Sequence, residues 1–268
     1  MQNSWECLIH LIPQVFQEKV QRHRKDLLEI RMRLGYPVEL VTMNDFGWLS
    51  EIATQEQIDH VVNIASRYSP WTTDIQAGYI TAAGGHRIGL AGIAGGSGFR
   101  QIQGLNIRVC RDMQGVSDGI EPNGNILIIG PPGSGKSTML RDLSRRASYY
   151  KSVTVVDERT ELFPEGFQRG RRMDVLTGFA KPRGIYMALR TLGPHMIALD
   201  EITAQEDCDA MVSATWCGVN LMATAHAASP EDLMGREVYK PIVRSGLFDR
   251  IIVMRPDKSW KEEKVNLV

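Results

Sequence analysis

The residues that most clearly carry chemistry form one glycine-rich stretch. It matches the G-x-x-x-x-G-K-[ST] pattern of phosphate-binding loops and comprises Gly130, Pro131, Pro132, Gly133, Ser134, Gly135, Lys136, Ser137 and Thr138. Glycines let successive backbone N–H groups turn toward a phosphate, and the N-terminus of a following helix adds partial positive charge. Lys136 supplies an ammonium for the β- and γ-phosphates, and Ser137 supplies a hydroxyl for Mg²⁺. The stretch predicts a site for a nucleoside triphosphate with Mg²⁺.

A pair of carboxylates follows a short apolar run. Asp200 and Glu201 come directly after residues 196–199, a run typical of strands buried in parallel sheets. Ligands gather at the carboxyl ends of such strands, so we expect the pair beside the phosphate-binding loop. Asp200 is then a ligand of Mg²⁺ together with Ser137, and Glu201 orients or deprotonates the attacking water. The alternative is an ordinary acidic helix cap.

Two further polar groups follow apolar runs of the same kind. The cluster Asp157-Glu158-Arg159-Thr160-Glu161 ends the run 153–156 and predicts water activation or positioning of nucleotide and metal. Its alternative is a charged loop with a capping residue. Thr224 and His226 mark the end of the run 221–225, where a polar residue and an imidazole can sense the γ-phosphate and transmit its loss. The alternative is a hydrogen-bonded histidine without a catalytic role.

Arginines occur in two places from which they could meet phosphate charge. Arg87, Arg100 and Arg108 lie in glycine-rich hairpins, and arginines from a neighbouring domain or subunit can stabilise charge on the γ-phosphate. Surface solvation is the alternative. A second basic set lies further along the chain: Arg169, Arg171, Arg172, Lys181 and Arg183. This set has few interleaved aromatic residues, so a solvated loop or a subunit contact is favoured over contact with nucleic acid.

The elements that must position these residues differ between the two halves of the chain. In the C-terminal half, apolar runs alternate with helical patterns, which predicts a mostly parallel α/β sheet. The runs are 125–129, 153–156, 196–199, 221–225 and 251–254, and the helical segments include 184–192 and 206–217.

The N-terminal half predicts a smaller α/β domain. Helix-type spacing covers 7–34, and strand-like alternation runs through 29–42. A helix is expected over 54–69, and antiparallel hairpins with glycine turns over 76–111. Turn-rich residues before the phosphate-binding loop suit a linker. The predicted domains are therefore 1–115 and 125–268, joined by a linker at 116–124.

Composition narrows the classes of partner. Lys+Arg and Asp+Glu are balanced at 31 each, so no overall field steers the chain of 268 residues to nucleic acid or acidic membranes. The four cysteines are scattered, which favours reduced thiols in the cytoplasm. The N-terminal residues do not resemble a signal peptide, and no apolar run approaches about 18 residues. Any association with a membrane is therefore expected to go through partner proteins.

The combined motifs resemble a known family from about residue 28 onward. VVDERTELF, DVLTGFAKPRG, ALDEI, TAHAASPEDL and GLFDRIIVMR follow the phosphate-binding loop, and EIRMRLGYPVEL, GYITAAGGHRIGLAG and LNIRV precede it. Together they are similar to the stage III sporulation protein AA family of endospore-forming bacteria, soluble relatives of the type II and type IV secretion ATPases. The resemblance implies a RecA-like P-loop ATPase domain behind a smaller N-terminal α/β domain. It also implies a hexameric ring that energises a membrane channel complex between mother cell and forespore, on the mother cell side.

The resemblance also assigns roles to residues. It implies that Gly130 to Thr138 are the Walker A loop and Asp200-Glu201 the Walker B element. Asp157, Glu158 and Glu161 resemble the acidic box of secretion ATPases, and His226 their histidine box. Arg87 and Arg108 look like the N-domain arginines that reach nucleotide in such rings.

Two departures from the family pattern bear on these roles. The segment Lys181-Pro182-Arg183-Gly184 is unusually basic, which suggests an altered subunit or partner surface. Asp200 is present where many secretion ATPases lack an aspartate, so the base cannot simply be transferred. We assign Glu201 as the base and Glu158 a supporting role.

The resulting hypothesis is a Mg²⁺-dependent ATP hydrolase. Two alternatives are a RecA-like ATPase stimulated by nucleic acid, which the neutral net charge disfavours, and a scaffold that uses ATP only for assembly. The intact carboxylate pair Asp200-Glu201 argues against the scaffold.

Overall fold

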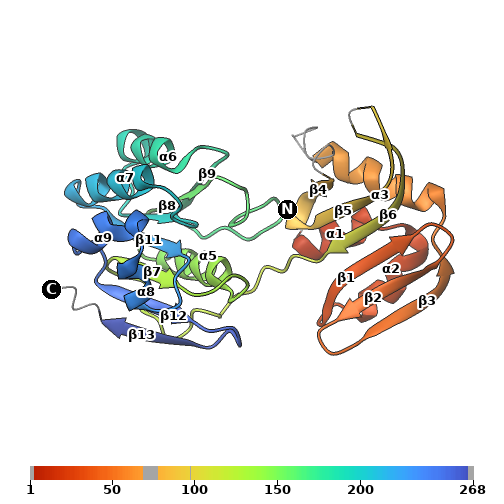
Figure 1. Cartoon of the computed structure of the whole chain (residues 1–268), viewed down its shortest axis with the longest axis horizontal. Coiled ribbons are helices and arrows are strands. Elements are labelled where there is room, and N and C mark those ends of the chain that lie inside the picture. Colours follow the sequence, from red (N-terminus) through yellow and green to blue (C-terminus); the bar gives the residue numbers. More distant parts are fainter. Residues whose placement is uncertain (1–2, 69–77, 97, 265–268) are drawn as a thin grey trace. The chain divides into compact units, whose positions relative to one another are not determined.

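The computed structural model describes residues 3–68, 78–96 and 98–264. The chain divides into two compact units, and Figure 1 labels most of their elements. The N-terminal unit comprises Met1–Asp112 with Pro164–Gln168, and the C-terminal unit comprises Met113–Phe163 with Arg169–Val268. Each unit has its own sheet and its own hydrophobic core.

The N-terminal unit is built on a fully antiparallel sheet. The strand order is β3 (Phe46–Ile52), β2 (Pro37–Thr42), β1 (Leu27–Arg33), β6 (Gly98–Arg108), β5 (Arg87–Gly95) and β4 (Tyr79–Thr81). Its helical segments are α1 (Ser4–Leu11), α2 (Gln14–Arg22), α3 (Gln55–Tyr68) and the 3₁₀ turn η1 (Ala83–Gly85). Apolar residues of the three α-helices pack with those of the strands in one core.

The types of element predicted for the helix and the hairpins of this half are confirmed, but some of their boundaries differ. The expected helix over 54–69 is α3, and the expected hairpins are β4, β5 and β6; Ser69, Gln76, Ala77 and Ser97 lie outside the described residues. The expectation of helix from residue 7 to 34 is wrong beyond α2. The first helix ends at Leu11, and Ile12 is extended because the helical region is disfavoured for a residue that precedes proline. The strand β1 then begins at Leu27.

The C-terminal unit is the predicted α/β sheet. Its strand order is β13 (Trp260–Lys264), β12 (Arg250–Met254), β7 (Ile126–Ile129), β11 (Asn220–Ala225), β10 (Met196–Leu199), β8 (Val153–Asp157) and β9 (Met173–Thr177). All neighbouring strands are parallel except β12 and β13. The edge strands β9 and β13 were not expected, because neither has the continuous apolar run of the central strands: β9 contains Asp174 and Thr177, and β13 is charged after Trp260.

Helices cover both faces of this sheet. The helical segments are α5 (Lys136–Ala147), α6 (Lys181–Met187), the π-helical η2 (Ala188–Leu192), α7 (Gln205–Trp216), α8 (Pro230–Gly235), η3 (Glu237–Tyr239) and α9 (Lys240–Arg244). Leu127 and Ile129 pack in one core with residues of α6, α7 and α9. Ile126 and Ile128, which alternate with them, point to the other face, where α5 contacts β7 and β11. Figure 1 shows these elements in green to blue.

The turn-rich segment 116–124 packs on the C-terminal unit. The backbone N–H and the hydroxyl of Ser117 both donate to the carboxylate of Asp142, over 2.9 and 2.7 Å. Arg146 donates to the carbonyl of Ile120 over 3.0 Å. Both partners lie on α5, so this segment is fixed to the helix that starts at the phosphate-binding loop.

Among the helices of the described residues, none has the length and apolar character needed to cross a bilayer.

Candidate nucleotide-binding site

The glycine-rich stretch forms the turn between β7 and α5. β7 ends at Ile129 and α5 begins at Lys136. Gly133 and Gly135 have φ of 76° and 95°, in the left-handed region that glycine tolerates best. Ser134 is fully buried, and within the described residues its hydroxyl has no hydrogen-bond partner. A buried orphan hydroxyl beside a helix N-terminus fits a phosphate oxygen as its missing partner.

Lys136 is folded back onto its own loop. Its ammonium donates to the carbonyls of Gly130 and Pro131 over 2.9 and 3.0 Å, and to Nδ1 of His226 over 3.0 Å. The side chain is largely buried, and this burial lowers the pKa of Lys136, against the opposing effect of Glu201 and Asp200. These are exchangeable contacts, because phosphate oxygens accept the same hydrogen bonds with a stronger charge attraction.

Ser137 and Asp200 meet where a magnesium ion would be needed. The Ser137 hydroxyl donates to Oδ1 of Asp200 over 3.3 Å. The same oxygen accepts from the hydroxyl of Thr224 over 2.8 Å. Hydroxyl and carboxylate oxygens suit Mg²⁺, which in nucleotide sites takes one or two protein ligands together with phosphates. The residues present therefore fit the metal that the sequence predicts.

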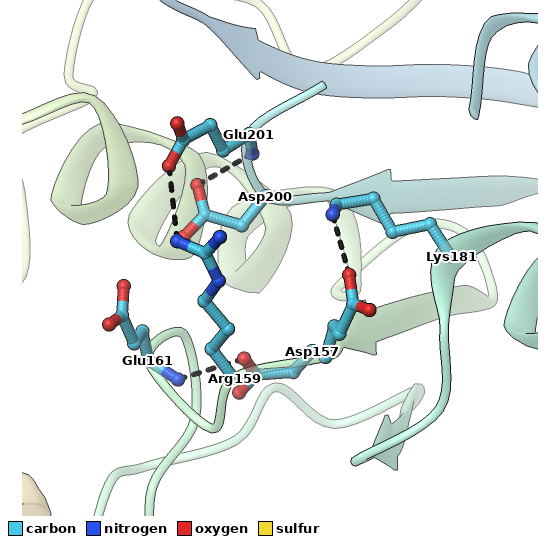
Figure 2. A pocket seen from close by; sticks show the side chains of 7 residues that line it. Asp157, Arg159, Glu161, Lys181, Asp200 and Glu201 are labelled. Atoms are coloured by element: carbon cyan, nitrogen blue, oxygen red, sulfur yellow. Dashed lines mark hydrogen bonds and ion pairs between the residues drawn. The ribbon is translucent and has the colours of Figure 1, made fainter. Parts of the chain in front are cut away.

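The carboxylate of Glu201 lies between the imidazole of His226 and the guanidinium of Arg159. Its Oε1 is 3.0 Å from Nε2 of His226, and its Oε2 is 3.6 Å from the guanidinium of Arg159. Since the Lys136 ammonium donates to Nδ1, the hydrogen-bond pattern assigns the His226 proton to Nε2, where it is donated to Glu201. A continuous polar chain thus runs from Lys136 through His226 and Glu201 to Arg159, and Figure 2 shows its Arg159–Glu201 end.

Asp157 is held by the loop that comes after it. Its carboxylate accepts the backbone N–H groups of Glu161, Leu162 and Phe163 over 2.8 to 3.1 Å. Burial raises the pKa of Asp157, and these three hydrogen bonds only partly oppose it. The side chain is 1% exposed, so it shapes the loop instead of meeting solvent or ligand.

Glu158 is paired with a buried lysine. Its carboxylate accepts from the ammonium of Lys181 over 2.6 Å, and that ammonium is also 3.9 Å from Asp207. Lys181 was expected on a basic subunit or partner surface, and that expectation is wrong for this residue, because it is 5% exposed and neutralised. Arg183 of the same segment is exposed. Figure 2 shows the lining of the small cavity of about 10 Å³ between these groups: Asp157, Glu158, Arg159, Glu161, Lys181, Asp200 and Glu201.

The structure brings most of the candidate residues to one edge of the sheet. The phosphate-binding loop, Asp200 and His226 come after β7, β10 and β11, which are neighbours in the order β7-β11-β10. Arg87 and Arg108 belong to the N-terminal unit, where they oppose each other on β5 and β6, and Arg87 lies 5.3 Å from the ring of Tyr79. Sequence reasoning missed the contacts of Arg159 and Lys181. For Thr224 the sequence predicted a share in sensing the γ-phosphate, but not its contacts with Asp200 and Glu201.

Comparisons with known proteins identify the family and the fold of the chain. The profile of the family described as "Sporulation stage III, protein AA" matches residues 2–264. The chain belongs to this family. It is 35% identical over 272 residues to "Stage III sporulation protein AA" of Bacillus subtilis (strain 168), covering 92% of this chain and 88% of that protein.

Two solved structures share the fold of the chain described here. One is the ATPase DotB of Legionella pneumophila, with TM-score 0.61, 17% identity, and coverage of 94% of this chain and 81% of that one. The other is the pilus retraction motor PilT with bound ADP, with TM-score 0.63, 15% identity, and coverage of 88% and 76%. The RecA-like P-loop fold predicted from the sequence is thus confirmed.

Proposed function

We propose that this protein is a Mg²⁺-dependent ATP hydrolase of the secretion-ATPase type. The observation that carries the proposal is the meeting of Ser137, Asp200 and Glu201 beside a phosphate-binding loop whose lysine is held by exchangeable contacts. Phosphoryl transfer to water requires mainly positioning and charge stabilisation, which a lysine, backbone N–H groups, a metal and a placed carboxylate supply.

The proposed chemistry assigns one task to each group. ATP draws Lys136 from the loop carbonyls and His226 to its phosphates, because the phosphates carry more negative charge than those acceptors. Mg²⁺ held by Ser137 and Asp200 would supply neutralising charge at the phosphates. Glu201 accepts a proton from the attacking water, and His226, released from Lys136, keeps its Nε2–H bond to that carboxylate.

The proposed setting is a ring acting on a sporulation channel. Family membership supports a role in energising a complex between mother cell and forespore, with the ATPase in the cytoplasm and held to the membrane by partner proteins. In a hexameric ring, Arg87 and Arg108 are proposed to reach nucleotide. The resemblance to the N-domain arginines of secretion ATPases supports this role, and the two residues are direct partners on β5 and β6.

The test is phosphate release measured together with size. Purified wild-type protein is expected to release phosphate from ATP only with Mg²⁺, and to form hexamers on ATP addition by sedimentation velocity. Lys136→Ala is the matched variant, and it is expected to lose turnover while its circular dichroism spectrum stays that of the folded protein. Turnover in Lys136→Ala equal to wild type would contradict the proposal, and nucleotide-dependent assembly without phosphate release would replace it by a scaffold.

A further inference from the structure

Glu201 has a backbone conformation that a glutamate rarely adopts. Its φ is +33°, and it is one of three non-glycine residues with positive φ in the described part of the chain. The Cβ atom makes this region unfavourable for residues other than glycine, so such a conformation persists only where neighbouring groups hold it. The strand β10 ends two residues earlier, at Leu199, so the sheet ladder itself does not fix Glu201.

The groups that hold Glu201 come from Thr224. The backbone N–H of Glu201 donates to Oγ1 of Thr224 over 2.7 Å, and more weakly to Oδ1 of Asp200 over 3.0 Å. The next amide, that of Ile202, donates to the Thr224 carbonyl over 2.8 Å. The Thr224 hydroxyl in turn donates to Asp200 over 2.8 Å. One threonine on β11 therefore fixes the amides on both sides of Glu201 and also orients Asp200.

The position of Thr224 in its strand explains this contact. Leu221, Ala223 and Ala225 of β11 face the core under α7, so the alternating Thr224 points to the opposite face, toward α5 and the phosphate-binding loop. Thr224 is 1% exposed, so solvent does not compete for its hydroxyl. A buried hydroxyl that accepts from one acidic residue's backbone and donates to another's carboxylate couples the two residues geometrically.

We propose that Thr224 is a positioning residue that holds Glu201 and Asp200 in the arrangement needed for turnover. This inference rests on the proposed function. Valine has the shape of threonine but cannot accept or donate, so Thr224→Val leaves the Glu201 amide with only its longer bond to Asp200. Asp200 then keeps the Ser137 hydroxyl as a partner but loses its shorter bond. Thr224→Ser retains the hydroxyl and removes only a methyl group.

The chain offers a matched control on β8, which is separated from β11 by β10 in the sheet. Thr154 of β8 is also 1% exposed, and among the described residues its hydroxyl has no hydrogen-bond partner. Thr154→Val therefore makes the same chemical change at the same degree of burial, without removing a hydrogen bond to the candidate site.

The experiment compares Thr224→Val, Thr224→Ser and Thr154→Val in the full chain. We expect kcat of Thr224→Val to fall about 10- to 100-fold, since a displaced catalytic group costs roughly that much, while its ADP affinity stays close to wild type. Thr224→Ser should recover most of the loss, and Thr154→Val should retain wild-type kcat. Equal kcat in the two valine variants, or a serine variant as slow as Thr224→Val, would overturn the proposal.

A second readout separates this inference from the proposed function. Hydrogen exchange of the Glu201 amide, followed by NMR, does not depend on hydrolysis. It should be faster in Thr224→Val than in Thr154→Val and wild type, and close to wild type in Thr224→Ser. Unchanged exchange in Thr224→Val contradicts the positioning role even if wild type hydrolyses ATP. If the Glu201 amide exchanges faster in Thr224→Val but the wild-type protein releases no phosphate, the Thr224–Glu201 hydrogen bond is supported and the proposed ATPase activity is refuted.

Discussion

The two acidic pairs of the C-terminal unit lie at the carboxyl ends of strands β8 and β10, which are neighbours in the sheet, yet their carboxylates meet different partners. Asp157 is buried under three backbone N–H groups, and Glu158 is paired with the buried Lys181. Asp200 instead meets the hydroxyls of Ser137 and Thr224. Glu201 contacts His226 and the exposed Arg159. Carboxylates bound to backbone amides and a buried ammonium hold a loop in place, whereas those bound to hydroxyls, an imidazole or an exposed guanidinium beside a phosphate-binding loop remain available to metal and water.

The difference arises in the turn at the carboxyl end of each strand. After β8, the chain turns back through Thr160, whose φ is +57°, so that the next backbone N–H groups point at Asp157. After β10, the turn at Glu201 directs its side chain to His226, at the edge where the phosphate-binding loop lies. A strand ending in Asp-Glu therefore does not by itself assign a role. The hydrogen-bond donors nearby decide whether the carboxylates are structural or reactive.

Glu201→Gln is expected to lower kcat more than any other substitution considered. A small effect on kcat would contradict the distinction between the two acidic pairs. An amide cannot take the proton of the attacking water, so kcat should fall about 10²- to 10³-fold. The amide keeps nearly the same shape, so ATP binding and melting temperature should stay close to wild type. Steady-state phosphate release, nucleotide titration and thermal melting measure these quantities. A loss of ATP binding equal to the loss of kcat would show that Glu201 acts in binding.

Asp200→Asn should sharpen the metal assignment. The neutral amide is a weaker ligand for Mg²⁺, so we expect kcat at low Mg²⁺ to fall about tenfold or more and to recover partly as Mg²⁺ is raised. A titration of phosphate release against Mg²⁺ measures this. The matched control is Asp157→Asn, whose Mg²⁺ dependence should follow wild type. Equal shifts in both variants would contradict the distinction between the two pairs.

Asp157→Asn is expected to act on stability. An asparagine side chain has one acceptor oxygen where Asp157 has two, so at least one of the three N–H groups loses its partner, at a cost of about 1 to 3 kcal/mol. Urea unfolding at neutral pH measures the free energy of unfolding. The turnover of the folded variant should fall far less than that of Glu201→Gln. An unchanged unfolding midpoint with abolished turnover would move Asp157 into the reactive group.

The pH dependence of stability gives the smallest expected effect. Burial raises the pKa of Asp157 above its usual value of 3.8, so the folded state keeps a proton that the unfolded state has lost. This contribution to stability is present at lower pH and is lost as pH rises from about 4 through the raised pKa. The difference in unfolding free energy between wild type and Asp157→Asn should therefore change over this range. A difference independent of pH would contradict the pKa shift.

The places of the candidate residues in the fold could be predicted where the sequence pattern is local. The loop from Gly130 to Thr138 carries its phosphate-binding pattern in consecutive residues, and the strands before Asp157, Asp200 and His226 are short apolar runs. The parallel order of the sheet then brings their ends to one edge. The fold class followed from the alternation of these runs with helical segments.

The contacts that distinguish the two acidic pairs were not predictable in the same way. The Lys181–Glu158 pair joins residues 23 positions apart, and the Thr224–Glu201 contact also spans 23. Such contacts depend on how loops pack after the strands are in place, and no periodic pattern records them. The composition of a basic segment such as Lys181 to Gly184 favours a surface position, although its lysine is buried beside a carboxylate.

The most direct test of the distinction is the ratio of kcat between two isosteric variants, Glu201→Gln and Glu158→Gln, measured by phosphate release at saturating Mg²⁺ and ATP. If Glu201 is the base and Glu158 only pairs with Lys181, Glu158→Gln retains most of the wild-type turnover while Glu201→Gln falls about 10²-fold or more below it. A Glu158→Gln variant as slow as Glu201→Gln, or slower, would contradict the account and place the base after β8.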